Sequence, residues 1–337
     1  MSGIEFYVVV LLVYLGTDLL AAWGLNLEYG ISGVANLAFI VVIAAGAYTY
    51  AILSLGPDSG NGGFQLYVIG LQLPFAVAVI AAAVVGAVVG VLIGVTGLKR
   101  IRQDYQGMVM LVISLMAVTV VGADTGFLNG QAGLSLIPNP FSSLSPVVGD
   151  WTYVAMVGVA CVIGFFVMKR FTGGPMGRAL RAMRDDEHAV AALGFSVVRL
   201  RLMSQAVGGA FGGVSGALLA AFIGGWSPGA WAYVETLALL TAIIVGGMGN
   251  DMGVSLGTFV IAVLLLQGVQ FLPQISSHTG LTEALGWIIL GVLTITFLWV
   301  RPQGIFKERR PFYRSPSGSD RPSPGDSGTG RVAAPPA

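Results

Sequence analysis

The sequence predicts an all-α, polytopic integral membrane protein with about nine transmembrane helices, within a range of about eight to ten. Two observations carry this prediction. Of the 337 residues, 55% are hydrophobic and only 10% are charged, whereas soluble proteins carry roughly 25% charged residues. Apolar stretches of roughly 20 residues also recur along almost the whole chain, and about 20 helical residues cross a hydrocarbon core. A soluble globular fold is therefore excluded.

The candidate spans follow one another along the chain. We place them at residues 4–23, 30–55, 66–97, 106–124, 151–168, 203–224, 233–247, 253–272 and 284–300. The second and third are longer than a crossing requires, so each is expected to tilt or to include an unwound turn. The first 98 residues contain no Lys or Arg. The basic region of a cleaved signal peptide is thus missing, and the first segment should remain as a helix.

The positive charges predict the orientation of these spans. All 17 Lys and Arg residues lie in three clusters, within residues 99–102, 169–201 and 301–331. Because Lys and Arg mark cytoplasmic loops, an even number of spans must separate neighbouring clusters. This rule places the N-terminus outside and the C-terminus in the cytoplasm.

One transmembrane domain is predicted over residues 1–302. It includes a cytoplasmic loop at 169–202 and an external loop at 125–150, which is either a docking surface for an external partner or a plain lid. Residues 303–337 form a cytoplasmic tail. The 24 residues from Arg314 onward include 14 Pro, Gly or Ser and no aromatic residue, so the tail should be largely disordered.

Several function classes are excluded by composition and by absent motifs. A net charge of +1 argues against a nucleic-acid binder with a large basic field. Cys161 is the only cysteine, and His188 and His278 lie far apart, so no disulfide and no Cys- or His-based metal site is predicted. Phosphate-binding loops and the common hydrolase motifs are missing as well. We therefore predict no catalytic residues, no metal and no cofactor; if ATP drives the protein, another subunit must bind it.

Glycine is abundant and regularly spaced. Sets at four-residue intervals are Gly86, Gly90 and Gly94; Gly208, Gly212 and Gly216; and Gly249, Gly253 and Gly257. Residues four apart share one helix face, so each set predicts a smooth groove for close helix packing. Gly209 and Gly213 widen the second face. This wider face is either a static helix contact or a surface that slides during function.

Acidic residues occur in or near the spans, at Asp18, Glu28, Asp124, Glu235, Asp251 and Glu283. An ionised side chain in mid-membrane is costly. We expect Asp18 to lie deep in the membrane and the other acidic residues to lie near the membrane–water interface. No Lys or Arg lies within any span to pair with them, so a proton-coupled secondary carrier is not favoured.

The longest cytoplasmic loop contains a short Ala-rich helix that ends at Gly194. Asp185 or Asp186 can cap its start, and Gly194 can close it in a left-handed turn. Val190 and Leu193 are expected on one side, ready for a groove of a soluble partner. A solvated surface helix is the alternative.

Six segments in order resemble the LivM-type permease of branched-chain amino acid ABC importers. They are GLNLEYGISGVANLAF with GAYTYA, RQDYQGMVMLVISLMAV with GQAGLSLIP, GRALRAMRDDEHAVAALGFSVVRLRL, AVGGAFGGVSGALLA, SPGAWAYVETLALLTAIIVGGMGNDMGVSLG and VRPQGIF. The resemblance covers about residues 24–306. It implies the ABC importer permease fold in a prokaryotic inner or cytoplasmic membrane. The partners it implies are a homologous second permease, two cytoplasmic ATPases, an external solute-binding protein and membrane lipid, with no nucleic acid.

The resemblance also implies roles for particular residues. The ATPase-coupling segment maps onto Gly177, Arg178, Arg181, Arg184, Asp185, Asp186, Glu187, Ala191 and Gly194. Independently of the resemblance, we expect a pathway or helix seam at Asn36, Gly208, Gly212, Gly216, Gly246, Gly247 and Gly249. The family commonly has a His shortly after the position of Gly33, and this chain has none there. The resemblance implies branched-chain amino acids as the solutes, and the missing His leaves related amino acids, amides or urea open. A sugar or nucleoside permease of the same superfamily and a self-sufficient secondary transporter are the alternatives.

Overall fold

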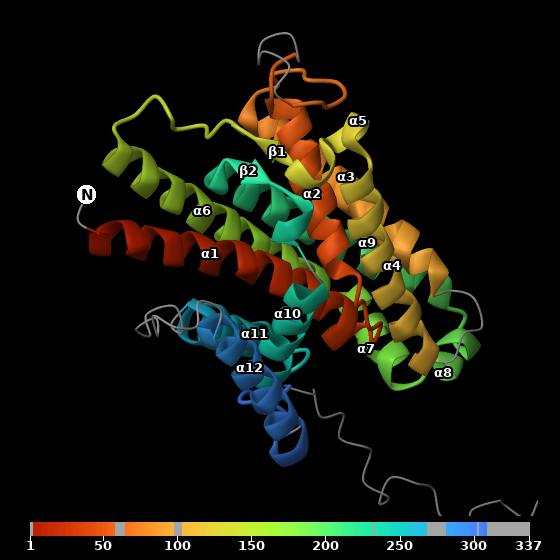
Figure 1. Cartoon of the computed structure of the whole chain (residues 1–337). Helices are drawn as coiled ribbons and strands as arrows, with labels where there is room; N and C mark the ends of the chain where they lie inside the picture. The colour runs from red at the N-terminus through yellow and green to blue at the C-terminus, as the bar shows by residue number, and fades with distance from the viewer. Residues whose placement is uncertain are drawn as a thin grey trace, which may run out of the picture.

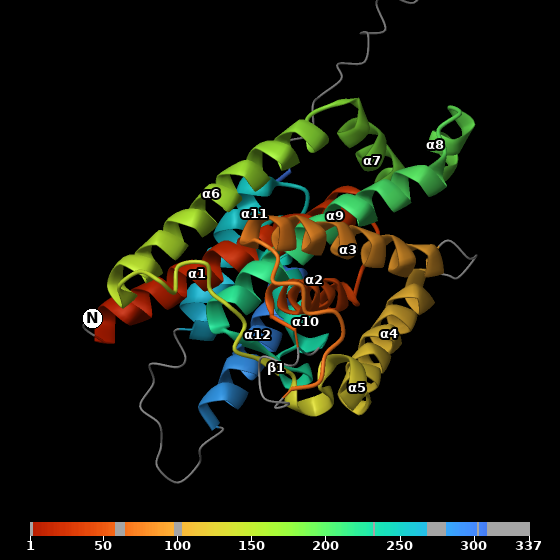
Figure 2. The same ribbon diagram turned by 90° about the horizontal axis from the view of Figure 1, so that it is seen from above.

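The protein is built almost entirely from helices (Figures 1 and 2). The computed structural model describes residues 3–57, 65–97, 103–231, 233–267, 281–301 and 303–308. The long helices are α1 (Gly3–Leu25), α2 (Phe39–Ser54), α3 (Phe75–Thr96), α4 (Gln103–Ala123), α6 (Pro146–Thr172), α9 (Val197–Ile223), α10 (Tyr233–Gly246) and α12 (Leu281–Val300). Helix α11 (Asp251–Thr258) continues as the π-helical η5 (Phe259–Gln267).

Short elements connect the long helices. They are the π-helical turn η1 (Asn26–Ile31), α5 (Thr125–Leu128), α7 (Pro175–Asp185), α8 (Glu187–Ala192), the 3₁₀ turns η3 (Gly130–Ala132) and η4 (Pro228–Ala230), and two short strands, β1 (Leu134–Ser135) and β2 (Gly225–Trp226). The strands pair antiparallel, with Leu134 opposite Trp226. This pairing fastens the 125–150 loop to the end of α9.

The predicted fold class is confirmed. Within the described ranges, six helices are long and apolar enough to cross a membrane, and shorter apolar helices cover residues 39–54, 251–266 and 284–300. Each of the nine predicted spans therefore contains an apolar helix. Part of the span placed at 253–272 lies beyond the described residues, which stop at Gln267 before resuming at Leu281.

The two longest predicted spans contain non-helical chain at their N-terminal sides, which is the second of the two alternatives expected for them. Helix α2 begins at Phe39 and helix α3 at Phe75, so most of residues 32–38 and all of 65–74 are not helical. Gly33 has a φ of +76°, which a regular helix does not accept. Pro74 has extended backbone angles and directly precedes α3, as expected for a residue that cannot donate an amide hydrogen bond. The excess length is thus broken chain rather than helix tilt.

Helix α9 forms the centre of the larger helix group. It packs against α2, α3 and α1, and α1 in turn lies beside α6 (Figure 2). Glycines allow the closest of these contacts: added Cβ atoms at Gly86 and Gly209 would each meet the main chain of the opposite helix. The predicted groove on α3 therefore faces the row formed by Gly209 and Gly213, and not the row of Gly208, Gly212 and Gly216.

A smaller group is formed by the last helices, below α1 in Figure 1. Its apolar core consists of Ala238, Ala242, Val245, Ile261 and Leu290, contributed by α10, η5 and α12. Trp23 of α1 links the two groups, because its indole N–H donates to Ser255 Oγ at 3.1 Å.

The segments beside the three basic clusters meet at one end of the molecule. Arg201 donates to the Gly97 carbonyl at 3.3 Å and pairs with Glu187, while Arg184 pairs with Glu308. We call this the basic end. At the opposite end, the Gln65 side chain bonds to the main chain of Ser135, beside the β1–β2 pair.

Candidate functional site

The segment from 175 to 194 forms two helices rather than one. Pro175 lies in the first turn of α7, where its missing N–H is harmless. Asp186 has extended backbone angles that end α7, and its carboxylate accepts from His188 N at 2.9 Å and Ala189 N at 3.1 Å. The predicted cap at Asp186 and the left-handed Gly194, with φ of +86°, are confirmed. Sequence reasoning missed that the preceding residues form α7.

Helix α7 has one buried face and one exposed face. Leu180 and Met183 join the main hydrophobic core. Gly177 is buried where an added Cβ would collide with the main chain of Thr172. Arg178 is exposed, as is Asp185, which lies 3.7 Å from Arg184 Nε. The apolar face therefore fixes α7 to the helix bundle.

The expected shared face of Val190 and Leu193 is wrong. Val190 is only 2% exposed and belongs to the core, whereas Leu193 is 75% exposed. The bend at Asp186 turns α8 so that one side rests on the protein. Ala191 and Phe195 are exposed near Leu193, and Figure 2 shows α8 at the outer edge of the molecule. The free surface of α8 is thus formed by residues 191–195, which are the end of the helix and the turn that follows it.

Two arginines of α7 meet one carboxylate from the end of the described chain. Arg184 Nη2 lies 2.7 Å from Glu308 Oε2, and Arg181 Nε lies 3.3 Å from Glu308 Oε1. Arg184 Nη1 also donates to the carbonyl oxygen of Gly30. Arg184 therefore ties α7 both to η1 and to the chain after α12.

Residues 303–308, on the tail side of the predicted boundary at 302, pack onto the helices. Ile305 N donates to the Val245 carbonyl at 2.8 Å, and Phe306 N donates to the Gly246 carbonyl at 3.0 Å. This segment is ordered by α10, with Glu308 as its link to α7. The prediction for the chain from Arg314 onward concerns residues outside the described ranges.

A buried polar network fills the break between α1 and α2. The Asn36 amide donates to Glu28 Oε2 at 2.8 Å and to Gln205 Oε1 at 3.3 Å. Ser204 donates to Ser32 Oγ at 3.1 Å. All five side chains are buried. We call residues 26–38 the broken segment, and its polar groups connect η1 to α9.

This network leaves polar atoms without partners. Glu28 Oε1 and Gln205 Nε2 are buried and form no hydrogen bond with any described residue. Buried orphan atoms are costly in a static interior. Glu28 lies at the end of its helix as expected, but inside the protein rather than at the lipid interface. Asn36, the expected pathway residue, is enclosed with it.

The loop after α10 reaches the same broken segment. Gly249 N donates to the Asn26 side chain at 3.0 Å, and Gly247 and Gly249 both have left-handed φ angles. A Cβ on Gly249 would lie about 3 Å from both Glu308 and Arg184. Gly246 packs against the main chain of Gly253 in α11. The structure therefore brings Gly249 to Arg184 of the expected coupling segment, whereas Gly246 lies against α11 and Gly247 against Phe306.

The glycines of α9 separate into distinct contacts. Gly208 faces Glu28, and Gly216 faces the main chain of Ile43. Gly212 instead faces side chains: an added Cβ would lie 3.1 Å from Phe39 Cζ and 3.2 Å from Val42 Cγ1. Gly212 is therefore the member of this row where a methyl group meets atoms that can move aside.

Ion pairs at the basic end were missed by sequence reasoning. Lys169 Nζ, at the end of α6, lies 3.2 Å from Asp251 Oδ2, at the start of α11. Glu187 pairs with Arg201, and Glu308 belongs to the region expected as tail. These pairs join groups between 14 and 124 positions apart in sequence, and only the excess of basic residues near helix ends hinted at them. Within the described residues, no three His, Cys, Asp or Glu side chains gather as a metal site would require.

Comparison with known proteins identifies the chain's relatives. The family model described as "Branched-chain amino acid transport system / permease component" matches residues 7–298. The high-affinity branched-chain amino acid transport system permease protein LivM of Salmonella typhimurium is 29% identical over 320 residues, covering 88% of this chain and 69% of the relative. No solved structure qualifies as similar.

Two further relatives extend the comparison. A probable LivM of Methanocaldococcus jannaschii is 26% identical and covers 89% of this chain and 93% of its own length. LivH of Escherichia coli, another permease of the high-affinity branched-chain amino acid system, is 22% identical over 86% of this chain and 91% of its own length. The resemblance seen in the sequence is confirmed, and the chain belongs to the family of branched-chain amino acid transport system permease components.

Proposed function

We propose that the chain is the LivM-like member of a permease pair in an ABC importer for branched-chain amino acids. The observation that carries this proposal is the family match across residues 7–298, which extends from α1 to α12. Similarity to both LivM and LivH supports a heterodimer of homologous subunits, with the solute passing between them. No phosphate-binding loop occurs in the sequence, so partner ATPases must supply the energy.

The ATPase is proposed to dock on the free surface of α8. Ala191, Leu193 and Phe195 provide a small apolar surface beside the basic end. A short exposed helix with small and apolar residues fits a groove in a soluble partner. Asp186 caps the helix and Val190 anchors it, so the surface is held in one orientation.

Movement of α7 is proposed to reach the solute path through the broken segment. Arg184 connects α7 to Gly30, and the Glu28, Asn36 and Gln205 network connects that segment to α9. A non-helical chain can change shape at lower cost than a helix, because it breaks fewer main-chain hydrogen bonds. The orphan atoms of Glu28 and Gln205 support this role, since they are free to find partners in a second state.

The proposed topology has the basic end in the cytoplasm. Segments beside all three clusters of Lys and Arg meet there, as the positive-inside rule requires. The opposite end, with β1 and β2, is then external and offers the docking surface for a solute-binding protein (Figure 1).

Reconstitution into liposomes tests this function. The chain with its partner permease, ATPases and binding protein should take up leucine, isoleucine or valine only when ATP is supplied to the ATPase side. The chain alone should transport none of them. Uptake by the chain alone would show a self-sufficient carrier. Uptake of amides, urea, sugars or nucleosides in place of these amino acids would show a different solute class.

A further inference from the structure

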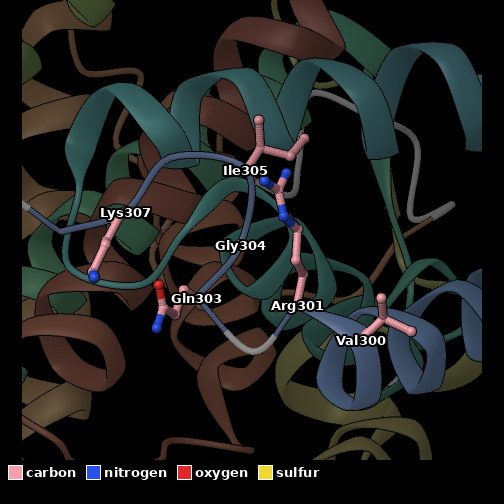
Figure 3. A pocket seen from close by; sticks show the side chains of 6 residues that line it. All are labelled: Val300, Arg301, Gln303, Gly304, Ile305 and Lys307. Carbon is pink, nitrogen blue, oxygen red and sulfur yellow. The ribbon is translucent and has the colours of Figure 1, made fainter.

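The chain after α12 forms a hollow of about 390 Å³ at the basic end. Its lining consists of Val300, Arg301, Gln303, Gly304, Ile305 and Lys307 (Figure 3). Gly304, with a φ of +69°, turns the chain, and its N–H donates to the Arg301 carbonyl at 3.0 Å. The hydrogen bonds of residues 305 and 306 to α10 then hold the chain that follows this turn. Two cationic side chains, one before and one after the turn, thus line the same hollow.

These cations are not neutralised by any acidic residue in the part of the chain that the structure describes. Neither Arg301 nor Lys307 forms an ion pair with a described residue, and both are exposed. The nearest acid in sequence is Glu308, and its carboxylate is held by Arg181 and Arg184 on α7. Gln303 adds an uncharged amide that can donate hydrogen bonds. The hollow is therefore suited to an anion with several acceptor oxygens.

An apolar stripe on α12 leads to this hollow. Ile288, Val292, Ile295 and Trp299 are exposed, and their spacing of four, three and four residues places them on one helix face. Trp299 is 88% exposed and stands one residue before the hollow. Exposed tryptophans concentrate where acyl chains meet headgroups. A lipid whose chains lie along this stripe would have its headgroup level with Arg301.

We propose that the hollow binds the phosphate diester of an anionic phospholipid, such as phosphatidylglycerol. Arg301 contacts the phosphate oxygens, Lys307 and Gln303, which lie on the other side of Gly304 from Arg301 (Figure 3), contact the rest of the headgroup, and the acyl chains follow the α12 stripe. Basic pockets beside transmembrane helices are known to bind acidic headgroups. The occupied hollow would hold residues 303–308 against α10, and so would hold Glu308 in place under α7.

Fluorescence quenching by brominated lipids tests the proposal on the full chain in nanodiscs. Brominated phosphatidylglycerol should quench tryptophan emission at a lower lipid fraction than brominated phosphatidylcholine. In the double variant Arg301→Gln, Lys307→Gln, the apparent affinity for the acidic lipid should fall about tenfold or more. Trp299→Phe should remove most of the difference in quenching between the two lipids, which identifies Trp299 as the reporter. A matched control, Arg170→Gln, removes an exposed cation from the end of α6 and should keep the preference.

Several results would overturn the proposal. Equal quenching by both lipids, or equal losses in the double variant and in Arg170→Gln, would leave only general attraction of a basic surface. Displacement of the lipid signal by inorganic phosphate at similar affinity would show a free-anion site instead. Unchanged lipid quenching with loss of ATPase binding in the double variant would show that the hollow belongs to the ATPase contact. Melting temperatures of all variants should match wild type, because the replaced side chains are exposed.

Discussion

Adding one methyl group at three different glycines separates static packing from a sliding surface. Gly90→Ala in α3 would place a Cβ 2.5 Å from the carbonyl oxygen of Gln205, a main-chain atom that cannot move without shifting α9. Gly212→Ala in α9 meets only side chains, at 3.1 Å or more. Gly158→Ala in α6 meets nothing within 4 Å. The three sites share the same chemical change and differ only in what surrounds it.

The magnitudes follow from these surroundings. Replacing a helical glycine by alanine favours the helix by about 0.5–1 kcal/mol at every site. Overpacking costs about 1–3 kcal/mol where neighbours cannot adjust. Gly158→Ala should therefore be slightly more stable than wild type, and Gly212→Ala close to wild type. Gly90→Ala should fall below Gly158→Ala by about 1–3 kcal/mol.

Melting in detergent and uptake in liposomes, measured on the same preparations, provide the assay. If α9 slides against α2 during transport, Gly212→Ala should melt like wild type yet take up solute more slowly, because a moving surface must stay smooth in both end states. Gly90→Ala should lose stability and uptake together. Proportionate losses of both properties at residues 90 and 212 would refute the sliding interpretation. Equal stability at residues 90 and 158 would refute the packing argument itself.

Three further predictions concern the basic end and the topology. Arg184→Gln removes charged hydrogen bonds, so it should lower the free energy of unfolding by about 1.5–3 kcal/mol and with it the melting temperature. Arg178→Gln, at an exposed position, should leave the melting temperature unchanged. Equal effects of the two changes would contradict the assigned contacts. Asp186→Ala removes the α8 cap and should cost about 1 kcal/mol, measured as faster amide exchange in α8 alone; unchanged exchange there would show that the cap contributes nothing. Ser143→Cys should react with a membrane-impermeant reagent in intact cells and Ser317→Cys should not, and the reverse pattern would overturn the orientation.

Much of the fold could be predicted because hydropathy and charge are local signals. The nine apolar stretches and the three basic clusters follow from the cost of placing polar groups in hydrocarbon, and the helices occupy those stretches. The N-terminal ends of α2 and α3 could not be predicted from hydropathy, because residues 32–38 and 65–74 are also largely apolar. Gly33 and Pro74 carried the missing information about backbone angles.

The site was predictable only in part, for a related reason. Caps and left-handed turns depend on neighbours in sequence, so Asp186 and Gly194 could be assigned from the sequence. The contacts of Arg184 and Asn36 join residues more than a hundred positions apart, and no local pattern specifies them. The prediction for Val190 was wrong because the helical repeat alone does not show which side of α8 lies against the protein.

The most direct test of the coupling segment is the ATPase response of the complex carrying Ala191→Glu. Ala191 is exposed on α8, so a charged side chain there should leave folding intact. Gly194 is a poorer choice, because its left-handed φ would be strained by any side chain. Arg170→Gln changes the net charge by the same unit at an exposed position outside α7 and α8. We expect normal permease pairing in both variants, with hydrolysis stimulated by loaded binding protein in Arg170→Gln and lost in Ala191→Glu. Stimulated hydrolysis at the wild-type rate in Ala191→Glu would contradict the assignment of α8 as the surface that receives the ATPase.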